Sequence, residues 1–196
     1  MSINPSEHAK AEDKALFGFW IYLMTDLALF VTLFATFAVL RSSTAGGPTG
    51  SEITDLPFVL TETIILLISS FVCGLALLSA HAGKKKNTLI LLAITFALGA
   101  SFVGLEMYEF NKLIDEGHSW EVSAFMSAFF TLVGTHGIHI TSGLIWLGVM
   151  IAQILKKGFS GGTIKRLTMF SLFWHFLDIV WIFIFTIVYL LGAVAV

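Results

Sequence analysis

The sequence predicts an all-α integral membrane protein: a bundle of five transmembrane helices with its N-terminus in the cytoplasm and its C-terminus outside, in the periplasm. Of its 196 residues, 57% are hydrophobic and only 12% are charged, whereas a soluble domain has about 45–50% apolar and about 25% charged residues. A chain this short cannot bury so much apolar surface inside one core. The excess therefore indicates that the surrounding solvent is a lipid bilayer.

Five stretches reach the length of about 20 mostly apolar residues that one membrane crossing needs. They cover residues 17–40, 57–80, 88–110, 122–155 and 168–195. The fourth stretch is longer than a perpendicular crossing requires, so we expect it to tilt or to project from the membrane. The breaks between the stretches are short and polar. We therefore expect residues 1–16 to form a cytoplasmic segment and residues 17–196 to form a single membrane domain.

Lys and Arg residues are distributed unequally between the two sides of this bundle. Counted on alternate sides, nine lie on the side of the N-terminus and two on the other side. The nine are Lys10, Lys14, Lys84, Lys85, Lys86, Lys156, Lys157, Lys165 and Arg166, and the two are Arg41 and Lys112. Because cytoplasmic loops carry the excess of Lys and Arg, this bias predicts that the N-terminus is cytoplasmic and the C-terminus external. If one crossing were wrongly assigned, Lys and Arg would be spread over both sides of the bundle. The bias therefore also supports the number of crossings.

The start of the chain is expected to remain attached rather than to be removed as a signal peptide. Glu7, Glu12 and Asp13 accompany the first lysines, and the hydrophobic run that follows has the length of a membrane crossing. The sequence carries no twin-arginine, lipidation or transit pattern. These features predict a multi-pass protein of a bacterial inner (plasma) membrane.

Composition also limits the kind of site that the chain can hold. Its formal net charge is -2 with 11 Lys and Arg residues, so it lacks the basic excess of a nucleic-acid-binding protein. We expect no nucleic acid partner. The single cysteine, Cys73, excludes a disulfide framework and a cysteine metal cluster.

Each predicted helix carries at least one ionisable residue within its apolar stretch. These residues are Asp26, Glu62, Glu106, Glu109, His136, His139, His175 and Asp178. A charged group at the centre of a membrane helix costs at least about 2.5 kcal/mol, so such groups usually face protein or water. The pattern predicts a bundle with a polar interior or with a polar face toward a partner.

Helical spacing and depth sort these residues further. Three pairs lie three residues apart and so share a helix face: Glu106 and Glu109, His136 and His139, and His175 and Asp178. One stripe at i, i+4 and i+7 holds Trp174, Asp178 and Trp181. At about 1.5 Å per residue, the three glutamates lie toward the external side and the other ionisable residues near the middle of the membrane. We expect a carboxylate cluster near the outer surface and one polar network between helices at mid-depth.

Four interpretations of these residues remain open. His136 and His139, joined by His175 from the next helix, have spacing compatible with transition-metal ligands. Histidines on two helices also serve as axial ligands of haem. The buried carboxylates are compatible with a proton relay. Finally, Glu62 or Glu106 in a lipid-facing crevice would meet lipid headgroups. The alternative to all four is a set of static hydrogen bonds between helices.

Glycines predict where helices come close together. Gly99 and Gly104 lie in the third stretch, and Gly134, Gly137 and Gly143 lie in the fourth. Small residues let membrane helices approach each other closely. We therefore expect neighbouring helices to approach these positions, including those beside the histidines.

Several segments match the motifs of one protein family. They are FGFWIYLMTD at 17–26, TAGGPTG at 44–50, LPFVLTET at 56–63, GASFVGLEMYEF at 99–110, FFTLVGTHGIHITSGLIW at 129–146 and SLFWHFLDIVWIFIFTIVYL at 171–190. GTHGxH and WHFxDxxW on successive membrane helices form a highly specific pair. The chain resembles subunit III of the haem-copper respiratory oxidases, most closely the five-helix subunit III of the bacterial cytochrome bo-type ubiquinol oxidases. The resemblance runs from about Phe17 to the C-terminus.

The resemblance implies an accessory role in a proton-pumping complex that oxidises ubiquinol and reduces O2. In this family, subunit I holds the haems, the copper and the quinol oxidation site. We therefore expect no catalytic centre, cofactor or metal in this chain. Its implied partners are subunit I as the main contact, subunits II and IV of the same complex, and membrane phospholipids.

Ten residues are candidates for structural, lipid-contacting or inter-helix polar roles. They are Asp26, Glu62, Glu106, Glu109, His136, His139, Trp174, His175, Asp178 and Trp181. None is implied to be a catalyst. The alternatives to the accessory role are an independent proton or ion transporter that uses the buried carboxylates, and a haem-binding membrane anchor.

Overall fold

The computed structural model describes residues 5–194, and over those residues it contains helices and no strand. The helices are α1 (Pro5–Leu40), α2 (Gly50–Ile53), α3 (Leu56–His81), α4 (Lys85–Asp115), α5 (Ala124–Lys157), α6 (Gly161–Ile184), the π-helix η1 (Phe185–Leu190) and α7 (Leu191–Val194). Five of the described helices are long and apolar enough to cross a membrane: α1, α3, α4, α5, and α6 with its continuation. Over the described residues, this confirms the prediction of an all-helical protein with five helices that are able to cross a membrane.

The helices extend beyond several of the apolar stretches read from the sequence. α1 begins at Pro5, so most of the segment expected at 1–16 is helical, while residues 1–4 lie outside the described residues. α4 continues to Asp115, and α6 begins at Gly161. Polar residues at these ends continue the helices past the apolar stretch, because a helix needs no apolar residue where it leaves the hydrocarbon.

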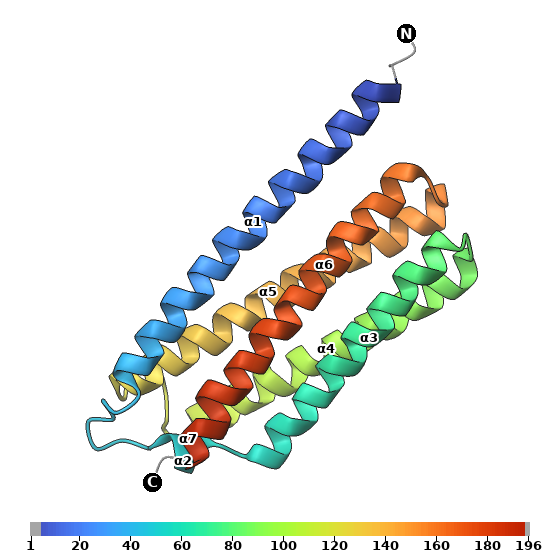
Figure 1. The fold of residues 1–196 in the computed structure, drawn as a ribbon. Coiled ribbons are helices and arrows are strands. Elements are labelled where there is room, and N and C mark those ends of the chain that lie inside the picture. Colours follow the sequence, from blue (N-terminus) through green and yellow to red (C-terminus); the bar gives the residue numbers. More distant parts are fainter. Residues whose placement is uncertain (1–4, 195–196) are drawn as a thin grey trace.

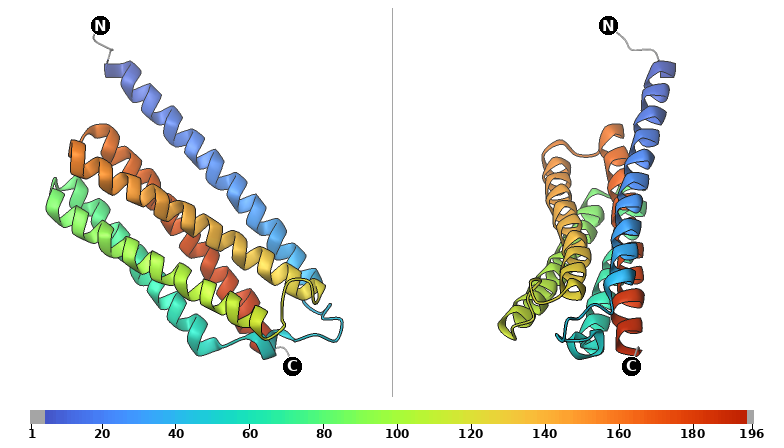
Figure 2. Two further views of the ribbon diagram at one scale, coloured as in Figure 1. Left: turned by 180° about the vertical axis from the view of Figure 1, so that it is seen from behind. Right: turned by 90° about the vertical axis from the view of Figure 1, so that its left-hand side faces the viewer.

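The five long helices lie in two layers. α4 and α5 form one layer, and α1, α6 and α3 form the other (Figures 1 and 2). α3 packs on α4, α4 on α5, α5 on α6 and α6 on α3, so these four helices close a ring, while α1 lies outside it against α5 and α6. Alternate antiparallel helices joined by short connections produce this up-and-down arrangement.

Two tight turns form what we call the lysine-rich end of the bundle, which carries Lys84, Lys85 and Lys86. Gly83 follows α3 with φ +71°, and Gly158 follows α5 with φ +70°. A residue with a Cβ is strained in this left-handed conformation. The Lys84 N–H donates to the Ser79 carbonyl at 3.0 Å, which closes the end of α3.

The opposite end, which we call the acidic end, carries Glu52, Asp55, Asp115 and Glu116. Two of the long helices begin there with side-chain caps. The Asp55 carboxylate accepts from the Phe58 N–H at 3.3 Å, and the Ser123 hydroxyl accepts from the Met126 N–H at 3.1 Å. Such caps satisfy backbone donors that have no partner inside the helix.

Large aromatic side chains fill the centre of the ring, and large aliphatic and aromatic side chains also cover its outside. Trp174, Trp181 and Tyr189 are almost completely buried, whereas Phe71 on α3 and Ile138 on α5 are 68% and 71% exposed. An apolar outer surface of this extent is unfavourable in water. Such a surface is favourable in the hydrocarbon of a lipid bilayer, which is the surrounding solvent that the composition predicts.

Candidate functional site

The three membrane glutamates on α3 and α4 lie together, as the sequence predicts from their depth. Glu62, Glu106 and Glu109 are 0%, 2% and 6% exposed, and they are close enough to interact electrostatically. The Tyr189 hydroxyl on η1 donates to Glu109 Oε2 at 3.0 Å. We call these three carboxyl groups with Tyr189 the carboxyl cluster.

The carboxyl groups of this cluster differ in their partners. Glu109 has the Tyr189 hydroxyl, whereas neither oxygen of Glu62 or of Glu106 has a hydrogen-bond partner among the described residues. Buried polar groups in proteins nearly always have such a partner. These two glutamates therefore have hydrogen-bonding capacity that no described residue uses.

Trp174 connects three helices of the ring. Its Nε1 donates to the Ser69 hydroxyl of α3 at 3.2 Å, and Ser69 in turn donates to the Thr95 carbonyl of α4 at 3.3 Å. The indole lies between two glycines: a Cβ at Gly99 would stand 2.9 Å from Trp174 Cη2, and one at Gly143 would stand 3.0 Å from Cζ3. Both glycines therefore make room for this side chain, as the sequence predicts.

Gly104 behaves differently from the other glycines of α4 and α5. A Cβ at this position would meet no atom within 4 Å. The expectation that a helix approaches closely at Gly104 was therefore wrong, because this face of α4 has no packed neighbour within the described chain.

Trp181 forms the second connection, toward the acidic end. Its Nε1 donates to the Thr63 hydroxyl of α3 at 3.0 Å. Its ring stacks on His136 of α5 with centroids 5.2 Å apart, and it meets the edge of Phe102 of α4 at 4.7 Å. The stripe of Trp174 and Trp181 that the sequence predicts on α6 thus faces the centre of the ring.

The two histidines of α5 have different surroundings although they lie three residues apart. His136 is 0% exposed, lies between the rings of Phe30, Phe102 and Trp181, and has no hydrogen-bond partner on either ring nitrogen among the described residues. His139 Nδ1 lies 2.7 Å from the Thr135 carbonyl oxygen of the same helix. Its Nε2 lies 3.9 Å from the Asp26 carboxylate of α1.

His175 and Asp178 of α6 meet α3 through one hydroxyl group. Ser70 Oγ lies 2.5 Å from His175 Nδ1 and also interacts with the Asp178 carboxylate. The polar residues at mid-depth therefore form separate contacts, α1 with α5 and α3 with α6. They do not form the single network that was expected from the sequence.

These separate contacts leave the three histidines without a common centre. His136 packs among aromatic rings, His139 faces Asp26, and His175 faces Ser70. Across residues 5–194, no group of three or more His, Cys, Asp or Glu side chains is placed so that it could hold a metal ion. The transition-metal interpretation has no support among the described residues.

Sequence reasoning missed several partners of the candidate residues. Thr63, Ser70 and Tyr189 supply or accept hydrogen bonds in the interior, yet hydroxyl residues in a membrane helix usually bond their own backbone. Tyr189 also lies in η1, where the Leu191 N–H bonds the Thr186 carbonyl. This π-turn changes the face on which later residues lie, and we find no local signal for it in the sequence.

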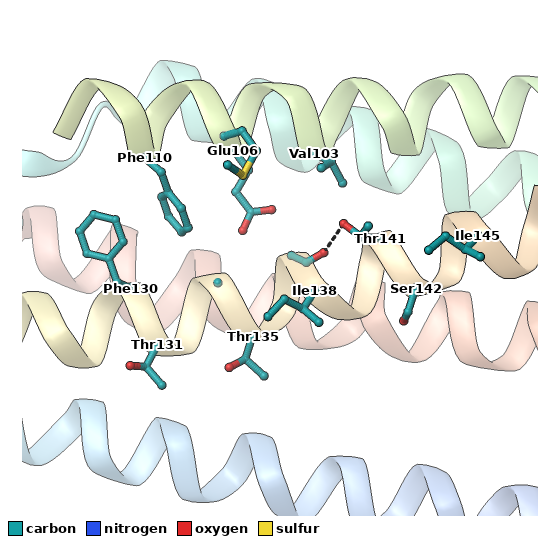
Figure 3. Close-up of a pocket in the computed structure, with 13 residues that line it drawn as sticks. Val103, Glu106, Phe110, Phe130, Thr131, Thr135, Ile138, Thr141, Ser142 and Ile145 are labelled. Carbon is teal, nitrogen blue, oxygen red and sulfur yellow. Dashed lines mark hydrogen bonds between the residues drawn. The ribbon is translucent and has the colours of Figure 1, made fainter. Parts of the chain in front are cut away.

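Two cavities open near the carboxyl cluster. A groove of about 600 Å³ between α4 and α5 has Glu106 in its lining (Figure 3). A second cavity, of about 390 Å³, lies at the acidic end and is lined by Glu109, Lys112 and Asp55 among others. The lining of the first is almost entirely apolar, whereas that of the second is about half polar.

Comparison with known proteins gives consistent matches over nearly the whole chain. The family model described as cytochrome c oxidase subunit III matches residues 3–193. Cytochrome bo(3) ubiquinol oxidase subunit 3 of Pseudomonas aeruginosa is 54% identical over 190 residues, which cover 95% of this chain and 91% of the relative. Quinol oxidase subunit 3 of Bacillus subtilis is 48% identical over 177 residues, covering 90% and 87% of the two chains.

A relative named for a different electron donor is also similar. Cytochrome c oxidase subunit 3 of Bacillus sp. (strain PS3) is 43% identical over 191 residues, covering 97% of this chain and 92% of the relative. The relatives named here are oxidase subunits. They give no support to the alternative of an independent transporter.

Proposed function

This chain belongs to the cytochrome c oxidase subunit III family, and on that premise we propose that it is a non-catalytic accessory subunit of a proton-pumping ubiquinol oxidase. The complex transfers electrons from ubiquinol to O2 in the aerobic respiratory chain. The observation that carries this proposal is the 54% identity to a ubiquinol oxidase subunit 3 over 95% of the chain.

The interior of the bundle supports an accessory role. Three of its candidate residues form hydrogen bonds between helices: Trp174 with Ser69, Trp181 with Thr63, and Glu109 with Tyr189. Haem and copper are then held by another chain, subunit I, which is the main partner. Subunits II and IV and membrane phospholipids complete the proposed surroundings.

The proposed location is a bacterial inner membrane, with the N-terminus in the cytoplasm and the C-terminus in the periplasm. The support is the concentration of lysines at one end of the bundle, since cytoplasmic loops carry more Lys and Arg. Alkaline phosphatase fused after residue 196 should be active, because this enzyme folds outside the cytoplasm. An active fusion of green fluorescent protein at the same point, with inactive phosphatase, would contradict this orientation.

Co-purification tests the proposed function directly. A tagged chain extracted in mild detergent should migrate with a larger polypeptide that shows haem absorbance and consumes O2 with ubiquinol. Purification as a solitary chain would refute the proposal. A Soret band on the chain alone would instead support the haem-anchor alternative.

Variants of the α6 polar residues separate a structural from a chemical role. Asp178→Ala removes a buried polar partner and His175→Ala a partly buried one. Each loss costs up to about 1–3 kcal/mol, so the yield of assembled complex should fall. O2 consumption per haem in the complexes that do assemble should stay unchanged. Ile179→Ala is the matched control, because this neighbouring residue on α6 is 54% exposed. Loss of O2 consumption in fully assembled complexes would contradict a purely structural role.

A further inference from the structure

The groove between α4 and α5 has the form of a ligand site that opens on the outer face of the bundle. Its volume of about 600 Å³ is in the range of small-molecule sites, which are mostly apolar with a few placed polar groups. Phe110 of α4 and Phe130 of α5 point toward each other at one end of the groove, with ring centroids 4.8 Å apart (Figure 3). Ile138, 71% exposed, and Ile145, 67% exposed, line it farther along α5.

Glu106 is placed at the base of this groove. Its side chain points from α4 toward α5 (Figure 3). It is 2% exposed, and neither of its oxygens has a hydrogen-bond partner within residues 5–194. Gly137 makes room for the carboxyl group, since a Cβ there would stand 2.7 Å from Glu106 Oε1. The neighbouring Thr131 and Ser142 hydroxyls already donate to carbonyls of α5. The Glu106 carboxyl oxygens, which are covered in this structure, therefore lack a hydrogen-bond partner among the described residues.

The charge of the lining limits the ligand. The residues that line the groove are all described, and they include Glu106 but no Lys, Arg or His. A phosphate group would meet a carboxyl group and no counter-charge, and burying a charge without a partner is costly. A phospholipid headgroup is thus disfavoured. The matching head is uncharged and carries a hydroxyl donor.

The depth of Glu106 indicates a ligand that partitions into the hydrocarbon layer of the membrane. Glu106 lies nine residues before the end of α4 at Asp115, which places it about 13 Å along the axis from that end. α4 has 31 residues, or about 46 Å, and the hydrocarbon is about 30 Å thick. Glu106 therefore lies inside the hydrocarbon, about 5 Å below its boundary if the helix is centred and upright.

We propose that the α4–α5 groove binds a membrane quinol, with its ring beside Phe110 and Phe130 and one ring hydroxyl donating to the Glu106 carboxyl group. The isoprenoid tail then follows Ile138 and Ile145 along α5. This inference rests on the proposed function, because the oxidase complex draws quinol from the same bilayer. The site holds quinol near the complex, and no electron transfer takes place there.

Photolabelling of the intact complex tests the quinol site. The complex is placed in nanodiscs of defined phospholipids with an azido-ubiquinol, which is kept reduced by excluding O2. The sample is illuminated, and the labelled peptides are mapped. Label is expected on α4 and α5. Ile138→Trp should lower this label by blocking the groove, and Ile179→Trp on α6, which does not line the groove, is the matched control.

The Glu106 variants test the hydrogen bond itself. Glu106→Leu removes the acceptor and should lower the labelling affinity by about two- to tenfold, the value of one hydrogen bond. Glu106→Gln retains a carbonyl acceptor and should restore most of the label. Equal labelling in the Leu variant and the wild type would overturn the proposal, as would a groove occupied by a phospholipid or by a helix of another subunit.

The outcomes for this site and for the proposed function are separable. A complex that purifies with haem and consumes O2 but carries no label on α4 and α5 refutes the quinol site alone. A chain that purifies by itself and still carries the label there refutes the accessory function and supports the quinol site.

Discussion

Two glycines on α4 provide a controlled measurement of helix packing in this bundle. Gly99 faces the Trp174 indole, where a Cβ would stand 2.9 Å from Cη2 and Cζ2 and 3.0 Å from Leu144 Cδ2. The indole cannot move away, because Gly143 contacts its other edge and the side chain is 1% exposed. Gly104, on the same helix, has nothing within 4 Å of the added carbon.

The expected effects of alanine at these positions have opposite signs. Both substitutions improve helix propensity by about 1 kcal/mol. Gly99→Ala also overpacks the core, which costs about 1–3 kcal/mol, so this variant should be neutral to destabilised by about 2 kcal/mol. Gly104→Ala should be neutral or stabilised. The difference between the two variants isolates the packing cost, because the propensity gain is common to both.

Thermal denaturation of the purified complex measures this difference. For a chain of this length about 1 kcal/mol shifts the midpoint by about 2–4 °C, so the Gly99→Ala complex should lose this subunit about 2–12 °C below the Gly104→Ala complex. Equal midpoints would refute the close contact between α4 and the Trp174 indole. A lower midpoint for Gly104→Ala would show that this face is packed by a partner.

Two further predictions concern the interior hydrogen bonds. Tyr189→Phe removes the donor to the buried Glu109 and should destabilise the complex by about 1–3 kcal/mol. The control, Tyr108→Phe, alters a side chain that is 62% exposed and should change the stability by no more than about 0.5 kcal/mol. Equal effects of the two variants would contradict the buried hydrogen bond. A double-mutant cycle of Trp181→Phe and Thr63→Val should give a coupling near 0.6 kcal/mol, the average between membrane helices, and zero coupling would contradict that contact.

The number of crossings and the depth of the glutamates could be predicted from the sequence. Apolar length sets the number of crossings, and the rise per residue sets depth along each helix. Glu62 and Glu106, on different helices, were therefore expected at the same level, and the structure brings them together. Helical spacing also placed Trp174 and Trp181 on one face, which is the face that packs in the centre.

The surroundings of individual side chains could not be predicted in the same way. Depth and face say nothing about how far each helix is rotated toward its neighbours. His136 and His139 share a face, yet one lies among aromatic rings and the other faces Asp26. Gly104 and Gly99 look equivalent in sequence, and only the arrangement of the helices distinguishes them.

The position of α1 outside the ring has a consequence for biosynthesis. α1 packs only against α5 and α6 among the long helices, and it is the least buried of the five candidate crossings. Its Asp26 faces His139, which lies more than 100 residues later in the chain. At about 5–20 residues per second, the ribosome needs on the order of ten seconds to deliver that partner. During this interval the Asp26 carboxyl group has the Tyr22 side chain of its own helix but lacks its partner on α5. A chaperone or insertase that shelters the first segment would therefore speed maturation.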